Sequence, residues 1–239
     1  MNETIKTKVL QKLMHNPGTN FNSLWNKEGE SNKFAYHLKQ LESIGLIEKK
    51  GDGMYYLSQE GKELALFIDG ATGKNVKRPL VSLLLVVFDN DGNILLHERL
   101  KEPFYGYYGY PGAKVDFGET ILGCAKRELF EETNLEADLE EVGLLNYVTY
   151  EGDSVAFHHT QFVIKCTNPK GMLKEKDREG NYSFVSEDEF LDKKLFPDDP
   201  YILDWVKENK YFRVEMDRFQ DNGEFKEITV KDVKYYEKR

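Results

Sequence analysis

Three carboxylates within one turn of a predicted helix are the residues whose type and spacing point most clearly to chemistry. Glu128, Glu131 and Glu132 lie at i, i+3 and i+4, so on a helix they share one face. Like charges this close repel one another, and a divalent cation that prefers oxygen ligands removes the repulsion. The spacing therefore predicts a cation site. The alternative is a solvated acidic helix face, the usual meaning of a charge run.

The helix that carries these carboxylates has a recognisable start. Thr120 can cap it, because a threonine oxygen accepts hydrogen bonds from the free N–H groups of a first turn. The helix is expected to run to about Thr133. A buried stripe is predicted at i, i+3 and i+7, namely at Leu122, Ala125 and Leu129. Arg127 and Glu119 lie outside the carboxylate triplet, and we expect them to pair with each other.

The stretch from Ala113 to Leu135 resembles the Nudix box, G-x5-E-x7-R-E-U-x-E-E-x-G-U, where U is a bulky aliphatic residue. The matching positions are Glu119, Arg127, Glu128, Leu129, Glu131, Glu132 and Leu135. Two positions depart, since Ala113 and Asn134 replace the two box glycines. Asn134 is a mild change, because Asn is the next best residue for the left-handed conformation at a helix C-terminus. A Cβ at Ala113 can crowd the loop.

The resemblance to the Nudix, or MutT-like, family implies a mixed sheet sandwiched by helices that hydrolyses a nucleoside diphosphate linked to a group X. It implies a bound Mg²⁺ or Mn²⁺ whose ligands would be Glu128, Glu131, Glu132 and the carbonyl of Ala113. The cation would neutralise the diphosphate and activate the nucleophile. Glu128 would serve as ligand or general base, with Glu119 and Arg127 orienting the site.

Substrate contacts are predicted upstream of the box. Arg99 could hold a phosphate, and the loop at 101–114 is rich in Gly and Tyr. Its aromatic side chains, with Tyr110 among them, either stack on a nucleobase or pack the loop on its sheet. Glu179 is a candidate for a further acid downstream. The sequence leaves X open between ADP-ribose, an oxidised nucleoside triphosphate and a dinucleotide polyphosphate.

Residues 1–69 show a different pattern. Helices are predicted at 3–15, 20–27, 31–45 and 59–68, and two short strands, at 46–50 and 54–58, lie between the last two of them. Ser31 is the expected cap of the third helix. This segment resembles the winged helix-turn-helix of small bacterial and archaeal transcription regulators.

The winged-helix resemblance implies double-stranded DNA as a partner. The third helix would present Lys33, Tyr36, His37 and Gln40 to bases, and the wing would present Lys49 and Lys50 to phosphates. A homodimer is the expected arrangement. Few positive charges favour the alternative of a domain used for assembly, since residues 1–77 contain no arginine and counterion release would be modest.

The predicted organisation is an α/β protein. A linker at 70–79 follows the winged helix, a Nudix domain covers 80–210, and a C-terminal β-hairpin covers 211–239. Residues 80–88 and 94–97 are expected to form a hairpin. Residues 1–79 carry 12 Lys+Arg and 9 Asp+Glu, a net charge of +3, whereas the remainder carries 21 and 33, a net charge of −12. That asymmetry indicates two parts with different partners.

The composition is that of a globular chain of 239 residues, with 40% hydrophobic and 31% charged residues. No run of about 18 apolar residues predicts a membrane span. The N-terminus lacks an apolar signal core, which suggests a cytoplasmic protein. Cys124 and Cys166 have no disulfide or metal spacing and are expected to be core thiols.

Two functions remain open. The first is a working Nudix hydrolase carrying a regulatory winged helix, which the intact carboxylates favour. The second is a transcription regulator whose Nudix domain senses a nucleotide metabolite, for example ADP-ribose, with little turnover. Ala113 and the winged helix favour the second.

Overall fold

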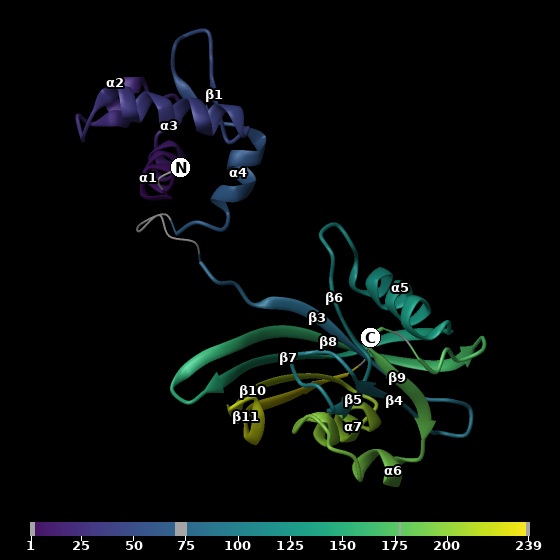
Figure 1. Cartoon of the computed structure of the whole chain (residues 1–239). Helices are drawn as coiled ribbons and strands as arrows, with labels where there is room; N and C mark the ends of the chain where they lie inside the picture. The colour runs from purple at the N-terminus through teal and green to yellow at the C-terminus, as the bar shows by residue number, and fades with distance from the viewer. Residues whose placement is uncertain (1–2, 70–75, 177, 238–239) are drawn as a thin grey trace. The chain divides into compact units, whose positions relative to one another are not determined.

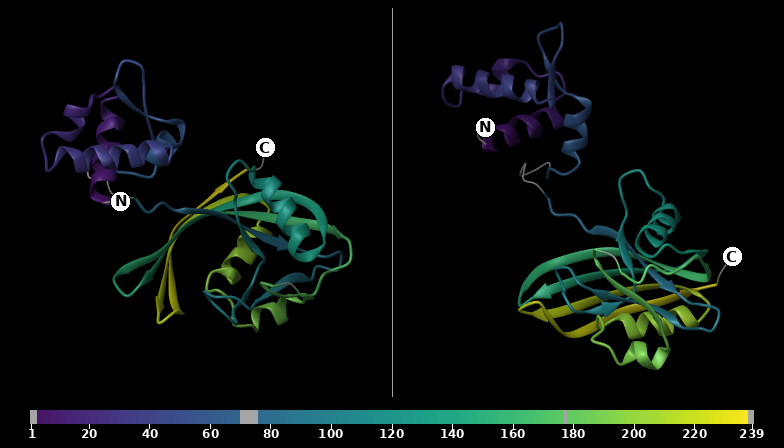
Figure 2. Two further views of the ribbon diagram at one scale, coloured as in Figure 1. Left: turned by 45° about the horizontal axis from the view of Figure 1, so that its top comes forward. Right: turned by 45° about the vertical axis from the view of Figure 1, so that its right-hand side comes forward.

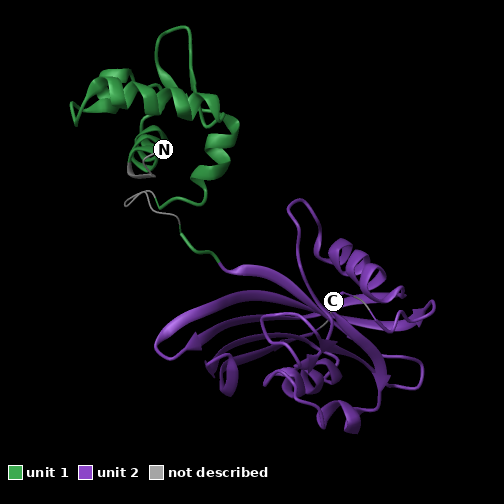
Figure 3. Cartoon of the chain, viewed as in Figure 1, with its two compact units in different colours: residues 1–78 green, residues 79–239 purple. Residues whose placement is uncertain are grey.

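The chain forms two compact units in a computed structural model that describes residues 3–69, 76–176 and 178–237. The units comprise residues 1–78 and 79–239 (Figure 3). Most of the predicted linker, residues 70–75, lies outside the described residues.

The first unit is a small helical domain with one β-hairpin (Figure 1). Its elements are α1 (Glu3–His15), α2 (Phe21–Trp25), α3 (Ser31–Ser43), β1 (Ile47–Lys49), β2 (Tyr55–Leu57) and α4 (Gln59–Ala65). Leu10, Leu38 and Leu41 are among the residues of its apolar core. Gly53, with φ +79°, makes the tight turn between the antiparallel strands β1 and β2. The N-cap of α3 is Glu30, so the predicted Ser31 cap is wrong.

The second unit contains two sheets. The first has six strands in the order β11-β10-β7-β8-β3-β6, and the second has three in the order β5-β4-β9. Their bounds are β3 (Leu80–Val87), β4 (Ile94–Arg99), β5 (Tyr108–Gly109), β6 (Gly112–Lys114), β7 (Glu136–Glu151), β8 (Ser154–Lys170), β9 (Gly180–Val185), β10 (Tyr211–Asp221) and β11 (Glu224–Tyr236). The larger sheet is mixed, because β3 pairs with β8 and β10 pairs with β7 in parallel.

The predicted hairpin of residues 80–88 and 94–97 does not form. Strand β3 has β8 on one side and β6 on the other, so both of its hydrogen-bonding edges are occupied. Strand β4 pairs instead with β5 and β9 in the smaller sheet. A single bridge between Phe88 and Ile94 is the contact that remains of the expected pairing among the described residues.

Helices cover both sides of the sheets (Figure 2). Helix α5 (Ile121–Thr133) packs through Cys124, Ala125 and Leu129 on one apolar cluster, which also contains Cys166. Helices α6 (Glu187–Leu191) and α7 (Asp199–Lys207) pack on a second cluster. The α/β fold with a mixed sheet between helices is therefore confirmed, and both cysteines are buried free thiols.

The C-terminal hairpin belongs to the large sheet. Strand β10 pairs with β7 from Phe212 to Gln220, and β11 pairs with β10. Phe212 lies opposite Gly143, where an added Cβ would come within 2.3 Å of the phenyl ring. A glycine is therefore required for β10 to approach β7 this closely. Among the described residues, no helix is both long and apolar enough to cross a membrane.

Candidate active site

A cavity of about 730 Å³ lies within the second unit. Its lining comes from α5, from both sheets and from the C-terminal hairpin. The four predicted metal ligands, Ala113, Glu128, Glu131 and Glu132, all contribute to it. Arg99, Tyr110 and Glu179 contribute as well.

Helix α5 is fixed at both ends by the local signals in its sequence. The hydroxyl of Thr120 accepts a hydrogen bond from the backbone N–H of Gly123 at 3.1 Å, as the capping prediction requires. Asn134 ends the helix in the left-handed conformation at φ 59°. Leu122 is 45% exposed, so its predicted place in the buried stripe is wrong.

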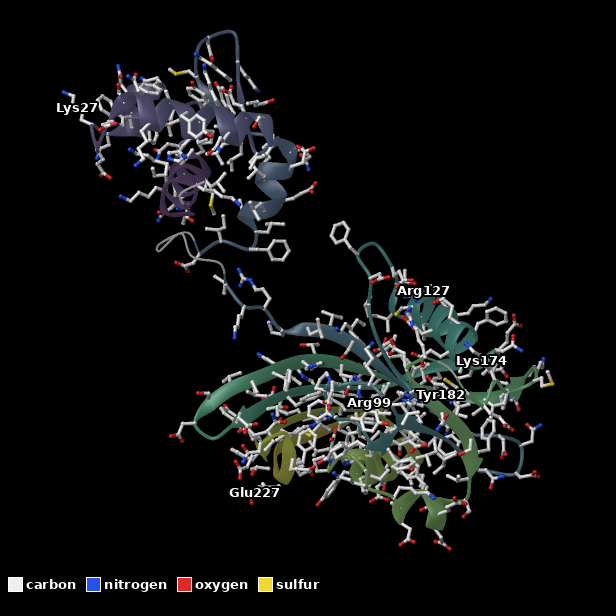
Figure 4. The ribbon with its side chains drawn as sticks, in the orientation of Figure 1. Lys27, Arg99, Arg127, Lys174, Tyr182 and Glu227 are labelled. Carbon is white, nitrogen blue, oxygen red and sulfur yellow. The ribbon has the colours of Figure 1, made fainter. Side chains whose placement is uncertain are left out.

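Arg127 is the centre of the charged network on α5, and Figure 4 labels it there. Its Nε and Nη2 donate to the two carboxylate oxygens of Glu119 at 2.7 and 2.8 Å. Its Nη1 donates to Glu128 at 2.8 Å and to Glu131 at 3.2 Å. The guanidinium thus makes the expected pair with Glu119 and also holds two of the three clustered carboxylates.

The network changes the proton affinity of its members. The hydrogen bonds from Arg127 lower the pKa of Glu119 to about 2. The same contacts, that with Glu119 first, raise the pKa of Arg127 further above its usual range. Glu119 is therefore a carboxylate at every physiological pH, and it is a fixed orienting group for Arg127.

Glu132 has a partner that sequence reasoning missed. The hydroxyl of Tyr182 donates to Glu132 Oε2 at 3.1 Å. The Tyr182 ring is 2% exposed and stacks on His97, with centroids 4.7 Å apart. Because β9 and β4 place these two rings opposite each other in register, the hydroxyl is held rigidly. No local signal marks this contact, since 50 residues separate the partners.

The chemistry of this donor set fits a hard divalent cation. Glu128, Glu131 and Glu132 offer carboxylate oxygens from one helical turn to one cavity, and Ala113 lies at its edge in β6. In the described part of the chain no three acidic, histidine or cysteine side chains are gathered as a metal cluster. Instead, Arg127 binds Glu128 and Glu131, and Tyr182 binds Glu132.

Arg99, Glu179 and Tyr110 have different surroundings. Arg99 ends β4 and donates from Nε to the carbonyl of Pro103 at 2.6 Å. Glu179 pairs with Lys101. Tyr110 is 5% exposed, and its ring stacks on Phe190 with centroids 5.0 Å apart. The structure therefore places Tyr110 in the core, because Phe190 and α7 cover it, and we assign it no base-stacking role.

A second set of polar side chains lines the cavity, and it lies on one face of the six-stranded sheet. Strand register places Arg218 beside Thr149, Tyr147 beside His159, and Gln161 beside Ser82, so these side chains share that face. Arg218 pairs with Asp198, and its guanidinium carbon lies 3.7 Å from the centroid of the Tyr147 ring. Sequence reasoning missed Arg218 and Gln161, because only the register brings these strands together.

Two titratable groups near this face, Asp199 and His159, have pKa values shifted in the direction that favours their uncharged forms. Burial, followed by the Asp198 carboxylate, raises the pKa of Asp199 well above its usual range. Burial, followed by Arg218, lowers the pKa of His159 to about 4. At neutral pH His159 is therefore uncharged, and Asp199 holds a proton more tightly than an exposed aspartate does.

Comparison with known proteins decides the family. Residues 78–206, more than half of the chain, match the NUDIX domain family. The chain belongs to the Nudix family. The Nudix hydrolase YvcI of Bacillus subtilis is 24% identical over 121 residues, which cover 50% of this chain and 75% of that protein. The predicted relationship and the hydrolase class are thereby confirmed.

Two further comparisons concern this Nudix chain. An ADP-ribose pyrophosphatase of Methanocaldococcus jannaschii is 41% identical over 49 residues, 20% of this chain and 29% of that protein. The crystal structure of a MutT protein from Bacillus halodurans has a TM-score of 0.54 and 23% identity, covering 64% of this chain and 97% of that one. The structural likeness shows the Nudix fold of the second unit.

The residues of the first unit that the sequence predicts to face DNA differ in exposure. Lys33 and Tyr36 are exposed on α3, and Gln40 donates to the Tyr36 hydroxyl at 3.0 Å. His37 is 6% exposed, so its predicted place among the exposed base-reading residues is wrong, because it lies towards the core with Leu38. Lys49 and Lys50 are exposed at the end of β1.

Replacing Ala113 by glycine tests whether its Cβ crowds the site. Ala113 lies in β6 opposite Leu83, and its φ is not positive. Ala113→Gly should therefore lower the free energy of unfolding by about 0.4–1 kcal/mol through unfolded-state entropy, without raising hydrolytic turnover. Urea unfolding and initial rates on one substrate measure the two effects. Faster turnover with unchanged stability would show that the Cβ does crowd the site.

Glu119→Gln should show a stability loss that depends on pH. The Glu119 pKa is lowered from its ordinary value of 4.5 to about 2, so its contribution is complete above pH 4.5 and is lost as the pH falls towards 2. The difference in unfolding free energy between wild type and variant should be constant from about pH 5 to 8 and shrink below pH 4.5. Urea titrations followed by Trp205 fluorescence in a Trp25→Phe background measure it. Exposed Glu136→Gln is the control, and a difference that is as large at pH 3 as at pH 7 contradicts the pairing.

Proposed function

We propose that the second unit is a divalent-metal-dependent hydrolase that cleaves the phosphoanhydride of a nucleoside diphosphate linked to X. The observation that carries the proposal is the network in which one guanidinium, that of Arg127, orients Glu119, Glu128 and Glu131 beside a cavity large enough for a nucleotide. Glu132, held by Tyr182, completes the set.

Each residue of the site has its own proposed role. Glu131 and Glu132 would hold Mg²⁺ or Mn²⁺, with Glu128 as a further ligand or as the general base and the Ala113 carbonyl assisting. When bound, the cation neutralises the diphosphate and lowers the pKa of a water nucleophile. Arg127 keeps the carboxylates in place, and Glu119 keeps Arg127 in place.

Arg99 is proposed to contact a phosphate from the rim of the cavity. It lies at the end of β4 among the cavity-lining residues, and its guanidinium adds positive charge to a lining that also contains the carboxylates of α5. Glu179, also in the lining, remains a candidate for a further acid. ADP-ribose is the first compound to test, because one relative bears the name ADP-ribose pyrophosphatase.

Glu132→Gln should lower metal-dependent hydrolysis by at least about 10-fold, since a ligand contributes no less than an outer-shell partner. The fold should persist, because the substitution removes the negative charge that Glu132 places beside Glu128 and Glu131 and so relieves repulsion. The measurement is the release of nucleoside monophosphate from a panel of nucleoside-diphosphate compounds with Mg²⁺. Glu136→Gln, which is exposed and outside the cavity lining, is the matched control. Unchanged turnover in Glu132→Gln would refute the metal assignment.

A second function, transcription regulation by a DNA-binding first unit, is favoured by one observation. Helix α3 exposes 59% of Tyr36 beside Lys33, and a hairpin with two exposed lysines follows it. In helix-turn-helix domains the recognition helix lies in the major groove and its exposed side chains contact base edges, and Lys33 and Tyr36 are proposed to take that role. We propose a homodimer that binds a palindrome and whose affinity responds to a nucleotide ligand.

The proposal that the first unit binds DNA predicts different effects for two kinds of substitution. Lys33→Ala should weaken specific binding more than non-specific binding, whereas Lys50→Ala should weaken both and flatten the salt dependence. Binding to DNA selected from random sequence is measured with and without ADP-ribose in the Glu132→Gln background. If the folded protein enriches no DNA sequence at low salt, the DNA-binding proposal is wrong and the first unit is an assembly domain.

A further inference from the structure

The segment that matches the Nudix family ends at residue 206, but residues beyond it also line the cavity. Strand β10 contributes Arg218 to its lining, and β11 contributes Phe225. Phe225 stacks on Phe104 with centroids 5.1 Å apart, which joins the hairpin to the loop after β4. The hairpin therefore completes a wall of the site in addition to extending the sheet.

Contacts with neighbouring residues fix the side chain of Arg218 in position. It is 7% exposed, pairs with Asp198 from the start of α7, and lies over the Tyr147 ring. Its Nε–H has no hydrogen-bond partner within the described residues. A buried N–H without a partner is costly, and a ligand that accepts its hydrogen bond removes that cost.

Gln161 offers the complementary atom on the same face. It is 7% exposed and lines the cavity, and its Oε1 also lacks a partner within the described part of the chain. Among the described residues, the sheet face therefore presents one unpartnered donor, on Arg218, and one unpartnered acceptor, on Gln161, and Asp199 of α7 adds a further unpartnered oxygen, Oδ2, to the lining.

The charge of this face limits what it can bind. The carboxylate of Asp198 balances Arg218, and His159, whose pKa is lowered to about 4, adds no positive charge at physiological pH. A phosphate or carboxylate would thus enter a face with no net positive charge and would lose its hydration without compensation. An uncharged polar ring meets no such penalty.

We propose that Arg218, on a strand beyond the matched Nudix segment, is the residue that determines specificity for the nucleobase of the substrate. The base would accept from Arg218 Nε and donate to Gln161 Oε1, since nucleobase rims carry both kinds of atom. The phosphates would then lie towards the carboxylates of α5. The inference rests on the proposed function in taking the ligand to be a nucleotide.

The test is equilibrium binding to the full chain without added metal, so it requires no hydrolysis. Isothermal titration with AMP, GMP, CMP and UMP is compared with ribose 5-phosphate, which lacks the base. Wild type should prefer at least one nucleotide over ribose 5-phosphate. Arg218→Lys keeps the charge that Asp198 needs but removes the Nε–H, and it should weaken that nucleotide about 10- to 100-fold while leaving ribose 5-phosphate unchanged.

Matched variants make the result unambiguous. Arg213→Lys changes an exposed arginine on the same strand and should bind like wild type. If Arg218→Lys fails to fold, Gln161→Met, which leaves the Arg218–Asp198 pair intact, should show the same selective weakening.

The outcomes separate the two proposals. Wild-type affinity for all four nucleotides in folded Arg218→Lys, or in Gln161→Met where Arg218→Lys does not fold, overturns the inference. A wild type that binds no nucleotide better than ribose 5-phosphate overturns it too. Base-selective binding that depends on Arg218, together with no hydrolysis under Mg²⁺, supports the inference and refutes the hydrolase proposal alone.

Discussion

The guanidinium of Arg127 is the one group on which the charged wall of the cavity depends. Without it, Glu128 and Glu131 would face each other on one helical turn with only solvent between their charges. With it, Glu119 is bound through both oxygens and the two helix carboxylates share a third nitrogen. The Arg127 side chain is 30% exposed, so solvent screens these pairs and their main effect is on geometry, not on stability.

The six-stranded sheet supplies the second constraint. Its register places Arg218, Tyr147 and Gln161 on one face, and these three residues line the same cavity as the α5 carboxylates. A site with a divalent-cation donor set at one part of its lining and a neutral, polar, buried face at another suits a ligand with a charged end and an uncharged planar end. A nucleoside diphosphate derivative has both.

The parts of the site that sequence could predict are those fixed by neighbours along the chain. The Thr120 cap, the Asn134 helix end and the carboxylate spacing are local, and each was found. Glu132 with Tyr182 and Arg218 with Asp198 are contacts between separate elements, so no local pattern marks them. The errors have the same origin, since the burial of His37 and the partner of β4 are decided by tertiary packing. Tertiary packing also decides the burial of Tyr110, for which the sequence left packing and base stacking open.

The most direct test of the account is where a divalent cation binds. An anomalous difference map from crystals containing Mn²⁺ locates the cation without assuming any activity. The account predicts a peak within ligand distance of at least two of Glu128, Glu131 and Glu132, with the Ala113 carbonyl nearby. A peak only on other acidic residues, or no peak in crystals grown with an excess of Mn²⁺, would contradict it.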